Sequence, residues 1–156
     1  MKSEPLAAIE AFGVAVRMEL EAIEVYTELA ARVHNQFLRR RLLLVASEEV
    51  EHKRILDEAY RKQFPDIPFG IAPHRLPIEI SSKSQRDGMP VKDILFHAVN
   101  EERKARDLYL DSERQVQDAA TRAVFRFLAE WEFSHEIQVM LDCELVTHYP
   151  KYFEEA

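Results

Sequence analysis

The chain has 156 residues, of which 47% are hydrophobic, and a formal net charge of −7. This length suits one domain with an ordinary core, so we expect a single domain over residues 1–156. The acidic balance argues against a nucleic-acid partner, whose phosphates need a basic patch, and against a polybasic membrane anchor.

Targeting signals and cysteine frameworks are also missing from the sequence. No apolar run resembles a signal peptide or approaches a membrane span. The one cysteine, Cys143, excludes an internal disulfide and a four-cysteine metal module within this chain. We therefore expect a cytoplasmic protein with no membrane partner.

Four proline-free segments rich in Ala, Leu, Glu and Arg predict four long helices. We expect these helices at residues 6–33, 37–62, 90–113 and 119–146. Ser3 and Pro5 precede the first helix, Pro90 begins the third, and Pro150 stops the fourth.

Residues 63–90 are expected to be a connector without a helix or strand, because five of the seven prolines lie there. The links within each pair of helices are short, so each pair should form an antiparallel hairpin. The chain is thus divided into hairpin 6–62, crossover 63–90, hairpin 91–147 and tail 148–156. This order predicts an all-α four-helix bundle.

A sparse internal repeat relates the two hairpins. Four chemically distinctive residues of the first hairpin recur 83 positions later in the second. The pairs are Glu19 and Glu102, Tyr26 and Tyr109, Glu49 and Glu132, and His52 and His135. Two similar hairpins packed around a pseudo-twofold axis would produce this pattern.

Each expected helix has an apolar stripe with a carboxylate near its middle. Glu19 and Glu49 are equidistant from residue 34, in the first expected turn, and their repeats are centred on residue 117, in the second. Such residues lie at one level of an antiparallel hairpin, about 22 Å from the turn. Four facing carboxylates repel one another unless a cation lies between them.

The repeated residues predict a metal centre. Carboxylates with some imidazole suit iron or manganese, whereas zinc is usually satisfied by four ligands. One Glu-x-x-His motif is expected about once by chance, but two motifs in a matching frame are not. We predict two iron ions, with manganese or zinc as alternatives, bound by Glu19, Glu49, His52, Glu102, Glu132 and His135.

Other polar residues have different expected roles. Tyr26 and Tyr109 lie two turns from Glu19 and Glu102, and are either core aromatics or hydrogen-bond donors to a ligand carboxylate. The glutamates that fall off the stripes are expected on solvated faces: Glu21, Glu24, Glu48 and Glu51.

This pattern resembles the ferritin-like superfamily and, within it, the rubrerythrin-type proteins. Residues 17–26 (RMELEAIEVY) and 48–52 (EEVEH) are similar to the first two rubrerythrin helices. Di-iron bundles of this class take a Glu from each of two helices and a Glu-x-x-His from each of the other two.

The resemblance implies roles for the predicted ligands. Glu49 and Glu132 would bridge the ions, Glu19 and Glu102 would be terminal ligands, and each histidine would bind one ion. A diferrous centre of this kind reduces peroxide or oxygen, and an external donor then re-reduces it. The chain has no rubredoxin module, so the donor would be a separate protein.

One departure and several alternatives remain. Rubrerythrins carry an exchangeable glutamate one turn from the ligand at Glu102, where this chain has Val99 and Ala105. A storage protein with ferroxidase activity would form a shell, although the chain after His135 is short for a fifth helix. A hydroxylase of an organic substrate would have an apolar pocket at the metals, and a purely structural bundle would bind metal without turnover. We also expect a homodimer.

Overall fold

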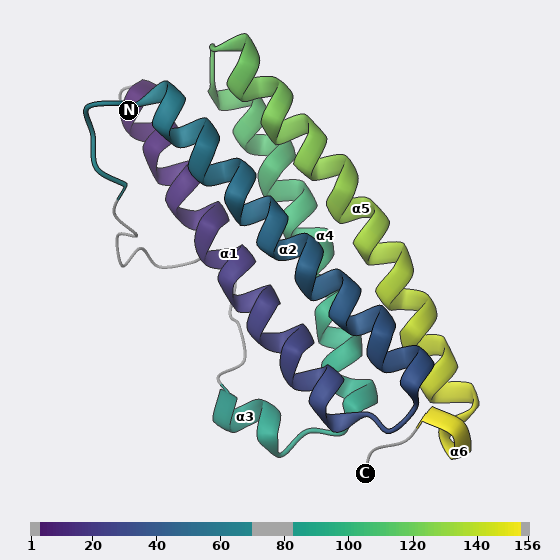
Figure 1. Cartoon of the computed structure of the whole chain (residues 1–156). Coiled ribbons are helices and arrows are strands. Elements are labelled where there is room, and N and C mark those ends of the chain that lie inside the picture. Colours follow the sequence, from purple (N-terminus) through teal and green to yellow (C-terminus); the bar gives the residue numbers. More distant parts are fainter. Residues whose placement is uncertain (1–3, 70–82, 154–156) are drawn as a thin grey trace.

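The computed structural model describes residues 4–69 and 83–153, and it is an all-α four-helix bundle, as predicted (Figure 1). The long helices are α1 (Glu4–Arg32), α2 (Gln36–Gln63), α4 (Val91–Gln115) and α5 (Ala119–His148). Two short helices, α3 (Lys83–Asp87) and α6 (Pro150–Phe153), complete the described elements. No helix in the described ranges has the length and apolarity needed to cross a membrane.

The bundle consists of two antiparallel hairpins, which confirms the predicted topology. The helix pair α1 and α2 forms one hairpin, and α4 with α5 forms the other. The hairpins pack through α1 against α4 and through α2 against α5. Each long helix therefore faces the same central space.

The second helix of each hairpin begins with the same type of cap. The side chain of Asn35 accepts a hydrogen bond from the backbone N–H of Leu38 at 3.0 Å, and Asp118 accepts from Thr121 N–H at 2.7 Å. Such caps satisfy backbone donors at the start of a helix. Asn35 and Asp118 are also 83 residues apart, so the internal repeat extends to the turns that set the hairpin register.

The expectation that the crossover contains no helix was wrong, because α3 lies within it. The side chain of Arg86 is 5% exposed and contacts two carboxylates of α1, Glu28 at 2.9 Å and Glu24 at 2.9 Å. Gly88 and Pro90 follow α3 and are residues that end helices. Residues 70–82 of the predicted crossover lie outside the described ranges.

Two apolar clusters occupy the two ends of the bundle. One contains Leu29, Leu42 and Leu95, and the other contains Phe12 and Phe125. Burying a side chain of this size contributes about 1.5–3 kcal/mol. The middle of the bundle is different, because a layer of buried carboxylates and imidazoles separates the two clusters.

Candidate metal centre

The four long helices each bring predicted ligands to the middle of the bundle. Helices α1 and α4 each supply one glutamate, and α2 and α5 each supply a glutamate and a histidine three residues later. All six residues are buried, none more than 4% exposed: Glu19, Glu49, His52, Glu102, Glu132 and His135. The structure therefore brings together every residue that the repeat predicted.

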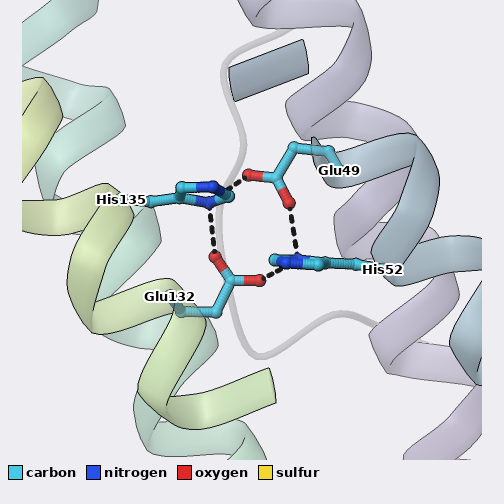
Figure 2. A group of neighbouring side chains, drawn as sticks. All are labelled: Glu49, His52, Glu132 and His135. Atoms are coloured by element: carbon cyan, nitrogen blue, oxygen red, sulfur yellow. Dashed lines mark hydrogen bonds and ion pairs between the residues drawn. The ribbon is translucent and has the colours of Figure 1, made fainter. Parts of the chain in front are cut away.

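Four of these residues form a closed ring of alternating carboxylates and imidazoles (Figure 2). Glu49 places one oxygen 3.0 Å from His52 Nδ1 and the other 3.0 Å from His135 Nδ1. Glu132 likewise spans the two rings, at 2.9 Å from His52 and 3.2 Å from His135. One ligand atom from each of the four residues lies within 4.8 Å of all the others.

The remaining two glutamates, Glu19 and Glu102, each lie beside a different histidine, so the cluster has two halves. A carboxylate oxygen of Glu19 lies 3.5 Å from His52 Nδ1, and one of Glu102 lies 3.8 Å from His135 Nδ1. Each half thus has one histidine and one glutamate of its own. Glu49 and Glu132 are shared by both halves.

Two tyrosines connect the hairpins at this level. The Tyr26 hydroxyl of α1 donates to Glu102 of α4, and the Tyr109 hydroxyl of α4 donates to Glu19 of α1. Both tyrosines are fully buried. Each hydroxyl therefore orients a carboxylate on the opposite hairpin.

The electrostatics of the cluster are unbalanced in the absence of a cation. Burial, together with the carboxylates of Glu102 and Glu19, raises the pKa of Glu49 to about 8. Burial would lower the pKa of His135, but its contacts with Glu132 and Glu49 raise it to about 12. The protein thus holds several like charges at close range and retains protons to offset them.

The residues fit a pair of cations. Both oxygens of Glu49 are buried and make no hydrogen bond in the described structure, although each lies close to an imidazole nitrogen. The lone pairs of the two histidine Nδ1 atoms and of the Glu49 oxygens point toward common positions. A metal ion at such a position would accept both kinds of lone pair. Four carboxylates with two imidazoles form a donor set suited to iron or manganese.

A cavity of about 70 Å³ lies between α1 and α4 and reaches Glu49 and Glu132. Its lining is largely apolar and includes polar groups. The apolar lining residues are Met18, Ala22, Val25, Ile94, Ala98 and Ala105, and the polar ones include Glu21, Arg86, His97 and Glu101. The volume holds a few molecules of the size of water.

The prediction that Glu48 lies on a solvated face was wrong. Its side chain is 28% exposed, and its Oε2 lies 2.8 Å from Nε2 of His135. This contact is between two different helices, α2 and α5. The spacing of residues along one helix therefore cannot predict it. Glu24 and Glu51 are exposed as expected, whereas the side chain of Glu21 is 25% exposed and lines the cavity.

Comparisons with known proteins agree with this architecture. A family model described as Rubrerythrin matches residues 10–140. No curated protein sequence matches the chain.

Solved structures share the fold. A hypothetical protein from Pyrococcus furiosus is 24% identical, with a TM-score of 0.77 over 91% of each chain. Structures described as ferritin-like, diiron-carboxylate proteins from Bacillus anthracis include a chain that is 20% identical, with a TM-score of 0.63 over 94% of this chain and 99% of that one. A conserved hypothetical protein from Mycobacterium tuberculosis is 16% identical, with a TM-score of 0.61 over 92% of each chain.

Proposed function

The chain belongs to the rubrerythrin family, and from this membership and the buried cluster we propose that it reduces hydrogen peroxide or oxygen at a pair of iron ions. The proposal rests on the way the six side chains form two halves, each of which could hold one ion. Each half has its own histidine and glutamate, and Glu49 and Glu132 contribute one oxygen to each half.

In this proposal His52 and Glu19 would hold one ion, His135 and Glu102 would hold the other, and the shared carboxylates would contact both. Two ferrous ions held there would supply one electron each, and these two electrons with two protons would reduce hydrogen peroxide to two water molecules.

The protein contributes position and access. Tyr26 and Tyr109 orient the outer carboxylates through their hydroxyl groups. The two apolar clusters lie on either side of the layer of carboxylates and imidazoles, and they exclude bulk water from the bundle axis. The cavity between α1 and α4 is lined by Glu49 and Glu132, so a small oxidant would meet the shared carboxylates there.

Re-reduction needs an electron donor outside this chain. The sequence contains one cysteine, Cys143, so it cannot form a four-cysteine iron module of its own. We propose that a separate protein supplies the two electrons. The identity of that donor is open to direct assay with candidate reductants.

A second candidate is a hydroxylase of a small organic substrate. The cavity favours it, because its lining is largely apolar and includes the shared carboxylates. The small volume favours peroxide or oxygen as the molecule that enters.

The test is anaerobic loading with iron(II), followed by mixing with hydrogen peroxide or with oxygen. We expect two irons per chain and faster oxidation by peroxide. Two irons that react mainly with oxygen would favour an oxidase or hydroxylase, and many irons per chain would favour storage.

Two variants serve as controls for this experiment. Glu132→Ala removes a shared carboxylate and should lose the rapid reaction. Glu51→Ala changes an exposed glutamate on α2 and should leave it unchanged. Failure to bind iron or manganese stoichiometrically would contradict the proposed metal centre.

A further inference from the structure

The outer nitrogens of the two histidines have different surroundings. Nε2 of His135 lies 2.8 Å from a carboxylate oxygen of Glu48. Nε2 of His52 is buried and has no hydrogen-bond partner in the described structure. The two halves of the cluster therefore differ in what surrounds the Nε2 atom of each histidine.

The internal repeat shows where this difference arises. Glu48 and Trp131 are equivalent positions, 83 residues apart, and each directly precedes a shared glutamate. The Trp131 ring packs against His52, with centroids 4.5 Å apart and planes at 73°. The pseudo-twofold axis therefore places a carboxylate behind one histidine and an indole behind the other.

The difference affects how each imidazole can act toward a metal ion. Each Nδ1 faces the shared carboxylates, so it is the atom that would bind an ion, and Nε2 then carries the ring proton. A carboxylate that accepts this proton's hydrogen bond fixes the tautomer and ring orientation, and makes the imidazole a stronger ligand. Glu48 does this for His135, whereas an indole ring offers His52 no comparable acceptor.

The other contacts of the cluster are matched between the halves. Glu49 and Glu132 each contact both histidines, and the two outer glutamates each accept a hydrogen bond from a tyrosine of the opposite hairpin. The pair of residues at positions 48 and 131 therefore departs from twofold symmetry where these other contacts of the cluster keep it.

We propose that Glu48 is a positioning residue that makes the two metal positions unequal. The position beside His135 binds a divalent cation more tightly and fills first, and the position beside His52 fills second. This inference rests on the proposed metal centre but not on its reaction with peroxide or oxygen.

The test is anaerobic titration of the metal-free protein with cobalt(II), followed by its visible absorption. We expect two binding steps in the wild-type protein. Glu48→Ala should weaken the tighter step by roughly 10- to 100-fold, and Glu48→Gln, whose amide oxygen still accepts a hydrogen bond, should weaken it less. Glu51→Ala, an exposed change on the same helix, should reproduce the wild-type titration.

Double variants locate the effect. In a His135→Ala protein, adding Glu48→Ala should change nothing, because the imidazole that Glu48 orients is gone. In a His52→Ala protein, the same addition should have its full effect on the remaining step. Circular dichroism of each metal-free variant checks that the helices are intact.

Several results would overturn the inference. They are equal affinities in the wild-type protein, a Glu48→Ala titration identical to wild type, or an effect that persists without His135. Inertness toward peroxide and oxygen would instead remove the proposed function and leave a Glu48-dependent first step intact, so the two failures are distinguishable.

Discussion

At the scale of single residues, Glu49 shows most directly what the cluster requires. Both of its oxygens are buried without a hydrogen bond, and its pKa is raised to about 8 by burial and by neighbouring carboxylates. A group in this state destabilises the metal-free fold. Its position is favourable only when a cation lies between it and the two imidazoles.

Replacing Glu49 tests its shared role. Glu49→Ala should lose at least one metal ion per chain, because one of the two carboxylates that span both halves is removed. The thermal midpoint of the metal-free variant should be no lower than that of the wild type, since burial raises the pKa of Glu49 and a carboxyl group with a raised pKa lowers stability at neutral pH. Metal analysis and a melting curve measure both effects, and two ions per chain in this variant would contradict the bridging role.

At the scale of elements, α3 shows how a very short helix is held. Five residues are too few for a helix to be stable by itself in water. Arg86 attaches it to α1 through Glu24 and Glu28, and Arg32 donates to the carbonyl oxygen of Met89 at 2.5 Å. The position of α3, whose Arg86 lines the cavity, therefore depends on a few charged contacts.

The attachment of α3 should depend on pH in a defined direction. Hydrogen bonding from Arg86 holds the pKa of Glu28 below its usual value of 4.5. This contribution to stability is thus present above pH 4.5 and is lost as the pH falls through the lower pKa of the folded protein. The protection factors of the α3 amides, which are corrected for the intrinsic exchange rate at each pH, should fall over that range.

Arg86→Ala should produce the same loss of protection at neutral pH, by roughly tenfold, because charged hydrogen bonds are removed. Asp87→Ala, an exposed change on the same helix, should leave exchange unchanged. Unaltered protection in Arg86→Ala would show that other contacts hold α3.

At the scale of the whole molecule, the proposed ions would join all four long helices. The ligand layer lies between two apolar clusters, and each hairpin supplies half of it. A ligand that binds only the folded state stabilises the whole bundle by mass action. The expected homodimer stays a prediction.

Metal binding should therefore raise the melting temperature of the intact protein. At a hundredfold excess of manganese(II) over its dissociation constant, we expect a rise of roughly 5–10 °C for a chain of this size. Calorimetry with and without metal measures the shift. Glu49→Ala should show a smaller rise, and an unchanged midpoint for the wild type would contradict a metal that bridges the helices.

The sequence by itself determined the bundle and the residues at its centre. Helix periodicity and the 83-residue repeat placed Glu19 and Glu49 on inner faces at one level, because the rise per residue is constant and the turns are short. The caps at Asn35 and Asp118 follow the same repeat and could have been recognised from it.

Only the tertiary structure decided which side chains meet between hairpins. The contact of Glu48 with His135, the donation from Tyr26 to Glu102, and the attachment of α3 to α1 all join residues more than 50 positions apart. Such contacts depend on the rotation and offset of whole helices, which local spacing does not specify. Of these contacts, the one between Glu48 and His135 makes the site between the two similar hairpins asymmetric.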